Sequence, residues 1–173
     1  MSVGEALTTD VTGAGQPGDR PAGIDEVRAA TESLRAVMER FDPSVVTVRD
    51  AQVLVPLFDE IERMSAAGKI LSAKRATDSP RLLREKGFKD GADYLARTTD
   101  TTTGEALGML ATAEAMEGLD ATTEAFKTGA LAPRKAVAVA SAARADADAE
   151  AEMLEIARTG SVRDVQERSR RVR

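Results

Sequence analysis

The chain has 173 residues, of which 42% are apolar, and its formal net charge at pH 7 is −5. Four Phe, one Tyr and no Trp leave a core that must be built from aliphatic side chains and Ala, which favours closely packed helices. There is no Cys, which excludes disulfides and thiolate metal sites, and no His, which removes the commonest general base and metal ligand. We therefore expect no enzyme active site, no metal and no cofactor in this chain.

We infer the cellular location of the protein from two kinds of targeting segment that its sequence lacks. No stretch approaches the 18 or more apolar residues of a transmembrane helix, and the N-terminus shows no basic region followed by an apolar one. We expect a cytoplasmic protein that does not associate with membranes. The negative net charge also argues against unspecific binding of nucleic acid by the chain as a whole.

Residues 1–23 contain five glycines and two prolines and few large apolar residues, which predicts a disordered N-terminal tail. Gly13, Gly15 and Gly18 have the G-x-G-x-x-G spacing of a dinucleotide-binding loop. That loop works only between a strand and a helix, whereas here no strand precedes it and Pro17 lies inside it. We therefore do not interpret this motif as a cofactor site.

Residues 24–41 are predicted to form an amphipathic helix that ends at Asp42-Pro43. The apolar positions recur at helical spacing and are Ile24, Val27, Leu34, Val37, Met38 and Phe41. Only residues 42–46 connect this helix to the next one. A link this short predicts that the two helices are antiparallel neighbours.

A long helix is predicted over residues 47–77, and the rest of the fold is expected to pack along it. Its apolar residues recur in steps of three and four and include Leu54, Leu57, Phe58, Ile61, Met64 and Leu71. Pro56 interrupts the pattern, because an interior proline removes one backbone hydrogen bond and crowds the preceding turn. We expect either a kink at Pro56 or a helix that begins near it.

The C-terminal part of this helix opens a basic segment, residues 63–89. It holds eight Lys or Arg residues and two carboxylates, a net charge of +6 that is opposite in sign to the whole chain. The last residues of the chain are also rich in Arg. These are the two credible nucleic-acid surfaces, and an ordinary solvated face is the alternative for both. The candidate nucleic-acid-binding residues are Lys69, Lys74, Arg75, Arg81, Arg84, Lys86, Arg168, Arg170 and Arg171.

Residues 90–173 are predicted to form an array of short helices. Three junctions look alike, each a tight turn that leads into a helix near Ala106, Ala136 and Val165, at separations of 30 and 29 residues. This spacing indicates a weak internal repeat of helix–turn–helix units. The alternative is that an Ala-rich bundle gives such spacings by chance.

Two motifs in this array have a functional and a structural interpretation. Residues 92–116 could be a DNA-binding helix-turn-helix, but residues 98–126 contain six carboxylates and no Lys or Arg, which favours a structural corner. Asp146, Asp148 and Glu150 mimic the start of a calcium loop. Ala151 and Ala157 stand where that loop needs Gly and Glu, so we interpret the run as a solvated helix N-terminus.

Several short segments, taken in order, carry a family resemblance over residues 51–173, about two thirds of the chain. They are the long helix over 53–75, Gly-Ala-Asp-Tyr-Leu-Ala-Arg at 91–97, Thr-Gly-Glu-Ala at 103–106, Gly-Ala-Leu-Ala-Pro-Arg-Lys-Ala at 129–136 and Val-Arg-Asp-Val at 162–165. This arrangement resembles the actinobacterial domain of unknown function that stands N-terminal to HNH endonuclease domains. The resemblance implies a helical domain associated with DNA and with a nuclease.

The chain departs from that family at two points. Family members usually carry several Arg after Gly-Glu-Ala, whereas this chain continues with Leu107, Gly108, Met109 and Leu110. The HNH module, whose chemistry needs His, is absent. We therefore expect a non-catalytic relative or a fragment, with nuclease activity only if the protein continues beyond Arg173.

The sequence thus predicts an all-α multi-helix bundle over residues 24–173 as a single domain, organised on the long helix. Two functions remain open. A DNA-associated module, which positions or regulates a nuclease on double-stranded DNA, requires its basic residues on one contiguous face. A protein-interaction or oligomerisation module, which pairs the long helix with another copy or a partner helix, requires apolar residues left over once the core is filled.

Overall fold

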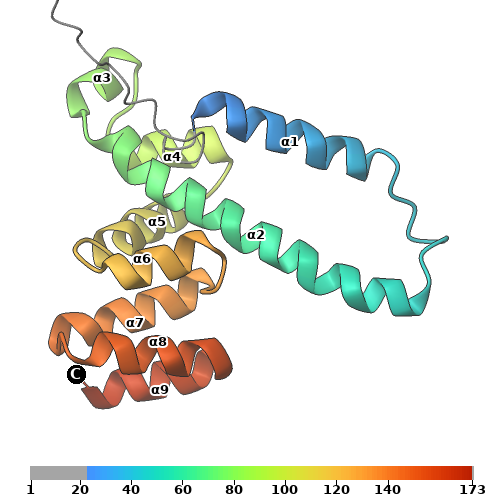
Figure 1. Ribbon diagram of the computed structural model, residues 1–173. Coiled ribbons are helices and arrows are strands. Elements are labelled where there is room, and N and C mark those ends of the chain that lie inside the picture. The colour runs from blue at the N-terminus through green and yellow to red at the C-terminus, as the bar shows by residue number, and fades with distance from the viewer. Residues whose placement is uncertain (1–22, 173) are drawn as a thin grey trace, which may run out of the picture. The chain divides into compact units, whose positions relative to one another are not determined.

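A computed structural model describes residues 23–172 of the chain (Figure 1). These residues form nine α-helices and no strand, which confirms the predicted all-α fold. The chain divides into two compact units, Met1–Thr47 and Val48–Arg173. The single domain over 24–173 and the antiparallel packing of its first two helices stay predictions. Apart from Gly23, the predicted tail and its glycine motif lie outside the described residues.

In the first unit, α1 spans Ile24–Met38 and has no buried residue. The Glu26 carboxylate accepts a hydrogen bond of 2.9 Å from the Gly23 backbone N–H, which satisfies one free donor at the helix N-terminus. The helix ends three residues before the apolar pattern does. Beyond it, Asp42 accepts hydrogen bonds from the Ser44 hydroxyl at 2.7 Å and the Ser44 N–H at 2.8 Å. These bonds lower the pKa of Asp42 and fix a turn of the kind that Asp favours.

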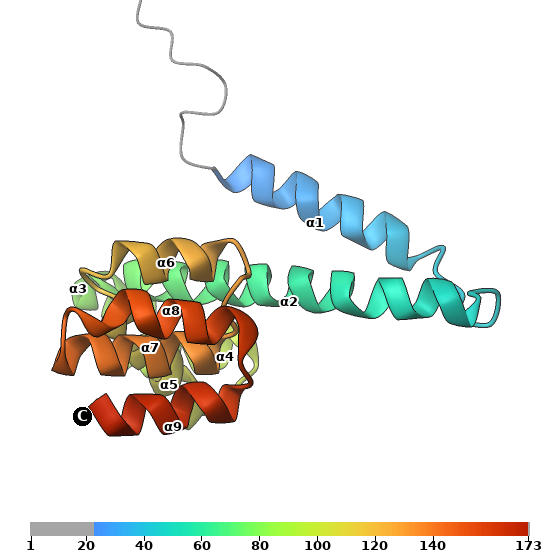
Figure 2. The same cartoon turned by 60° about the horizontal axis from the view of Figure 1, so that its bottom comes forward.

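The second unit begins with α2, which spans Val48–Thr77 and contains Pro56 in its interior. The alternative of a helix beginning near Pro56 was therefore wrong. Pro56 and Gln52, whose carbonyl loses its partner, are both exposed, so water can replace the missing bond. The buried residues of α2 are Ala67, Ile70 and Ala73, all in its C-terminal half. The N-terminal half, residues 48–64, extends past the short helices of the unit, and we call it the α2 arm (Figure 2).

After α2 comes the short helix α3, at Pro80–Glu85. The six helices that follow form three consecutive pairs. The pairs are α4 (Gly91–Thr99) with α5 (Thr103–Ala115), α6 (Asp120–Lys127) with α7 (Pro133–Ala145), and α8 (Ala149–Thr159) with α9 (Val162–Val172). The members of each pair pack together, and α5, α7 and α9 also pack in a row, so that the pairs stack one after another (Figure 1). The helix–turn–helix units are thus confirmed as structural elements. Their origin as a sequence repeat stays a prediction.

The second helix of each pair begins at one of the three similar junctions. The Thr102 hydroxyl accepts from the Glu105 N–H at 3.2 Å, and the Glu105 carboxylate accepts from the Thr102 N–H at 2.8 Å. Ser161 and Asp164 make the same reciprocal pair before α9. Pro133 is the first residue of α7, where its missing N–H costs nothing. The side chains of Thr102 and Ser161 thus cap α5 and α9, and Pro133 occupies the first turn of α7.

The core of the second unit lies around α7. Six of its thirteen residues are buried, five of them Ala, and small side chains let α5, α6, α8 and α9 approach it closely. Phe126, Leu131, Met153 and Val165 fill the space around it. A smaller cluster, formed by Ala73, Ala92, Leu95 and Ala106, joins α2 to α4 and α5.

Two side chains satisfy the ends of neighbouring helices. The half-buried Glu150 of α8 accepts from the Thr122 hydroxyl at 2.7 Å and from the Thr122 N–H at 3.0 Å, in the first turn of α6. The Lys135 ammonium of α7 donates to the carbonyls of Ala157 and Gly160 at 2.8 and 2.7 Å, where α8 ends. Both charges suit the helix dipoles they meet. The predicted solvated N-terminus therefore needs correction at Glu150, which serves another helix.

The loop between α6 and α7 rests on α2 at Gly129. This residue is buried and has φ +74°, and a Cβ added there would come within 3.0 Å of Met64 Cγ. The Arg63 Nε donates to the Gly129 carbonyl at 2.6 Å. Gly129 therefore allows both a left-handed turn and a close contact between the α6–α7 loop and α2.

Candidate nucleic-acid interface

Four exposed cations of the predicted basic segment lie on or just after α3. We call Arg81, Arg84, Lys86 and Lys89 the basic tip. The chain turns at Gly87, which has φ +81°, and the Phe88 N–H donates to the Leu83 carbonyl at 2.9 Å. This is the hydrogen bond of a Schellman motif, a helix ending that requires Gly or Asn at the left-handed residue.

The turn after α3 is held by side chains of α4. The Phe88 and Tyr94 rings meet edge to face with centroids 5.1 Å apart, and the Arg97 guanidinium lies 4.9 Å from the Phe88 ring centroid. Asp93 accepts from the Lys89 N–H at 2.9 Å. These contacts position the turn before any ligand arrives. Phe88, Tyr94 and Arg97 were not predicted to contribute to this surface, because their contacts depend on how α3 and α4 pack.

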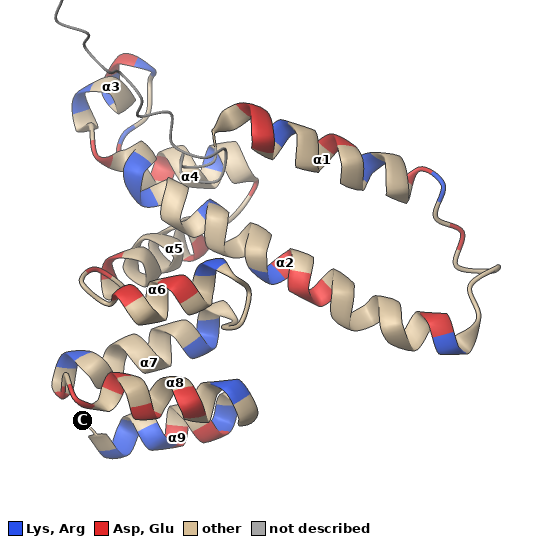
Figure 3. Ribbon diagram, in the orientation of Figure 1, with Lys and Arg blue, Asp and Glu red and all other residues tan. Residues whose placement is uncertain are grey.

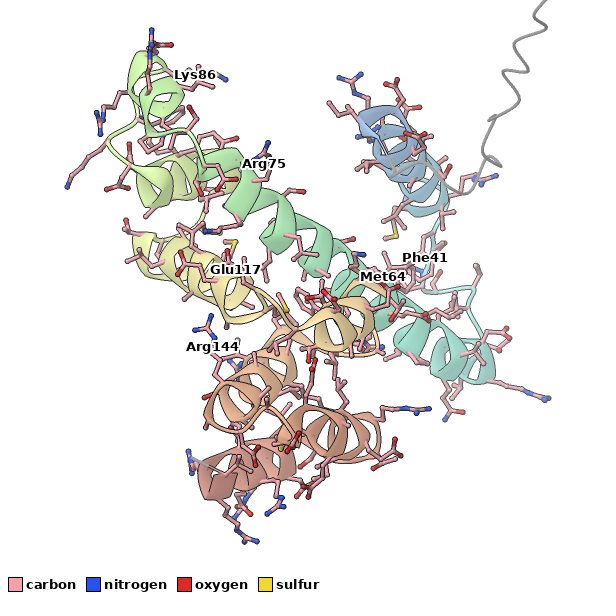
Figure 4. The ribbon with its side chains drawn as sticks, turned by 60° about the vertical axis from the view of Figure 1, so that its left-hand side comes forward. Phe41, Met64, Arg75, Lys86, Glu117 and Arg144 are labelled. Carbon is pink, nitrogen blue, oxygen red and sulfur yellow. The ribbon has the colours of Figure 1, made fainter. Side chains whose placement is uncertain are left out.

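The basic tip differs from the rest of the segment in its charge partners. Arg81 pairs with Glu85 at 2.8 Å, but within residues 23–172 Arg84, Lys86 and Lys89 have no carboxylate at ion-pair distance. Lys86 lies at the outer end of α3, as Figure 4 shows. The basic tip thus holds three exposed cations without acidic partners in the described part of the chain, all within six residues.

The α2 candidates are less available than the tip. The Lys74 ammonium lies 3.3 Å from Glu117 and 3.9 Å from Glu114, and the hydrogen bond and charge of Glu117 raise the pKa of Lys74. Arg75 pairs with Asp78 at 3.0 Å. Glu105 has a lowered pKa, chiefly through its hydrogen bonds with Thr102 and also through the charge of Lys69. The α2 cations therefore face carboxylates of their own unit.

The candidates on α9 lie at the other end of the helix stack, so the structure does not bring the two predicted sets together (Figure 3). Arg168 donates to both carboxylate oxygens of Glu152 through Nη2, at 2.7 and 3.0 Å. Arg170 lines a groove between α7 and α9, and Arg171 is exposed. Arg173 lies outside the described residues.

The helix-turn-helix candidate, α4 with α5, has a structural role. Ala106, Thr112 and Ala113 of α5 are buried, and α5 packs on both α2 and α4. The carboxylates of Glu114 and Glu117 meet Lys74 on α2. A helix that is packed on two sides and carries acidic groups is poorly suited to the major groove.

Comparisons with protein-family models, curated proteins and solved structures found no match to this chain. Within residues 23–172, no group of three or more His, Cys, Asp or Glu side chains could hold a metal ion. Among the helices formed by those residues, none combines the length and apolar character needed to cross a membrane.

Proposed function

We propose that this chain is a non-catalytic helical module that associates with double-stranded DNA through its basic tip and positions or regulates a nuclease. The observation that carries the proposal is the set of three exposed cations, Arg84, Lys86 and Lys89, for which the described residues supply no acidic partner. Cations of this kind can release counterions from DNA phosphates without first breaking an ion pair. The link to a nuclease is supported by the resemblance of residues 51–173 to HNH-associated domains.

The test is fluorescence anisotropy of a labelled duplex at several salt concentrations between about 50 and 200 mM, the range over which phosphate contacts lose affinity. The first variant carries Arg84→Gln, Lys86→Gln and Lys89→Gln. The matched control carries Arg28→Gln, Arg35→Gln and Arg40→Gln, three exposed arginines of the first unit.

Each lost phosphate contact should lower the slope of log K against log salt by about 0.9. We expect the tip variant to lose up to roughly three such contacts, whereas the control keeps most of its affinity. Equal losses in both variants would show that the binding is unspecific attraction. No binding by the original chain at the lowest salt would refute the proposal for this chain.

A second candidate function, self-association through the α2 arm, is favoured by a separate observation. Large apolar side chains of the arm are exposed, among them Val53 at 57%, Val55 at 69% and Leu57 at 49%. Exposed apolar residues that cluster on one element are typical of interaction sites. The other helices of the second unit leave these side chains uncovered, since the buried residues of α2 begin at Ala67.

Sedimentation velocity over a range of protein concentrations tests this candidate. The double variant Val53→Ser and Val55→Ser should shift any dimer toward monomer. Leu107→Ser, which alters a 55% exposed apolar residue on α5, is the matched control. A monomer at every concentration, or an equal effect of the control, would exclude self-association through the arm.

A further inference from the structure

A groove of about 220 Å³ lies between α7 and α9, at the end of the stack opposite the basic tip. One wall comes from α7 and the other from α9, and its lining residues are Arg134, Val137, Ala138, Ser141, Gln166, Ser169 and Arg170. The groove therefore combines two guanidinium groups, two hydroxyls and one amide with a short apolar wall. It contains no carboxylate.

The two arginines of the groove lack the partners that their neighbours have. On α9, Arg163 pairs with Glu167 at 2.9 Å and Arg168 with Glu152 at 2.7 Å. Among residues 23–172, neither Arg134 nor Arg170 has a carboxylate at ion-pair distance. Two guanidinium forks on facing helices match an oxyanion with several acceptor oxygens, since each fork can donate two parallel hydrogen bonds.

Ser169 gives an independent indication of a ligand. It is only 2% exposed, and its hydroxyl makes no hydrogen bond within the described part of the chain. No fully buried side-chain nitrogen or oxygen in that part lacks a partner. The hydroxyl of Ser169 is therefore not fully buried. Ser169 lines the groove, which gives it access to solvent. Ser169 is thus a nearly buried polar residue that lines the groove and has no side-chain partner in the described part of the chain.

We propose that this groove binds a phosphate group, either as inorganic phosphate or as the phosphate of a small phosphomonoester. The donors are Arg134, Arg170, Ser169 and Ser141, and Val137 offers apolar surface to the carbon next to an ester oxygen. The volume lies below the roughly 300 Å³ of the smallest drug-sized pockets and equals about seven waters of roughly 30 Å³ each. The site is separate from the basic tip and does not depend on the proposed function.

The experiment is a titration of the whole ¹⁵N-labelled chain with inorganic phosphate and, separately, with methyl phosphate, followed by NMR. The variants are Arg134→Gln and Arg170→Gln. Arg171→Gln is the control, because it removes the same charge from the neighbouring position of α9 but lies outside the groove. We expect shifts at the amides of Ser141, Gln166 and Ser169, and affinity about tenfold lower or more in each groove variant. The control should lose less than about twofold.

Tighter binding of methyl phosphate would support an ester as the ligand, and binding of inorganic phosphate alone would support the free ion. An equal loss in Arg171→Gln, or shifts spread over all cationic surfaces, would overturn the proposal. So would binding of duplex DNA without binding of either small phosphate.

A further variant keeps the proposal testable if a groove arginine also supports the fold. Ser169→Ala removes one donor and changes no charge, and circular dichroism would show whether its helix content is retained. Affinity several-fold lower at full helix content supports the site. Unchanged affinity in Ser169→Ala would overturn it.

Discussion

The two halves of α2 belong to one continuous helix but differ in what surrounds them. In the α2 arm, Val55 and Leu57 are 69% and 49% exposed, whereas Ala67 and Ile70 in the other half are 0% and 5% exposed. Ile70 is as large as Leu57 and larger than Val55, yet it is the buried one. Burial along α2 follows the position of α4, α5 and α6 rather than the size of the apolar residue. An apolar period indicates a helix, but the neighbouring helices decide which part of it becomes core.

The sharpest test of this difference compares Ile70→Ala with Leu57→Ala. Truncating the buried Ile70 should lower the free energy of unfolding by about 2–5 kcal/mol, because it removes packed methyl groups and leaves a cavity. The same truncation at the half-exposed Leu57 should change it by roughly 0.5 kcal/mol. Urea denaturation followed by circular dichroism measures both. Similar losses at the two positions would mean that the arm is packed in solution.

A second test lies where the arm meets the stack, at Gly129. Gly129→Ala should destabilise the chain by at least about 1–2 kcal/mol, since a Cβ is disfavoured at φ +74° and would also crowd Met64. The control is Gly68→Ala on α2, where a Cβ meets nothing within 4 Å. Ala in that helical position should stabilise the chain by roughly 0.5–1 kcal/mol. Thermal unfolding measures the Tm of both variants, and a higher Tm for both would contradict the described contact between Gly129 and Met64.

The ion pairs of the C-terminal half of α2 should have a smaller effect. Lys74→Met removes a half-exposed charge that lies between Glu114 and Glu117, and we expect a modest fall in Tm. Because the pairs are partly solvated, the fall should shrink at 500 mM salt. Arg75→Met, which leaves only the exposed Asp78 unpaired, is the control and should change Tm less. A salt-independent fall at Lys74 would indicate lost packing instead of lost charge.

The smallest effect is expected from the cap of α5, the helix on which this half of α2 rests. Hydrogen bonds from Thr102 lower the pKa of Glu105 below its ordinary value of 4.5. The carboxylate therefore contributes stability that is complete above pH 4.5 and disappears as the pH falls through the lowered pKa. Glu105→Gln removes that titration. The Tm difference between the two proteins should be greatest near neutral pH and vanish in acid, and a constant difference would assign the effect to geometry alone.

Some features of this fold can be predicted from the sequence alone. The long helix was predicted over residues 47–77 and spans Val48–Thr77. The prediction agrees with the structure because the apolar spacing continues along the helix and Gly68 lies on an exposed face, where it does not interrupt the helix. The three junctions near Ala106, Ala136 and Val165 were predicted because the residues that start each helix lie within a few positions of one another. The burial of α7 on almost all sides was not, since an Ala-rich helix shows no contrast between faces.

The candidate site was harder to predict, because each group depends on a distant partner. Arg168 and Lys74 were predicted to bind nucleic acid, but Glu152 of α8 and Glu117 of the α5–α6 turn form ion pairs with them. Arg134 was overlooked, because only the packing of α7 on α9 places it beside Arg170. Glu150 was predicted to be solvated, whereas it accepts hydrogen bonds from Thr122, 28 residues away in the sequence. A local sequence pattern does not indicate contacts between residues that are far apart in the sequence.

The central position of α7 also has a consequence for how the second unit opens. Val139 and Ala140 are fully buried and their helix contacts α5, α6, α8 and α9. Freeing the amides of α7 therefore requires those four helices to separate, so their hydrogen exchange should report the free energy of global unfolding. Amides of the α2 arm need no such separation and can exchange through local fraying. The slowest protons of the unit would thus belong to its most Ala-rich helix, although Ala buries the least apolar surface per residue.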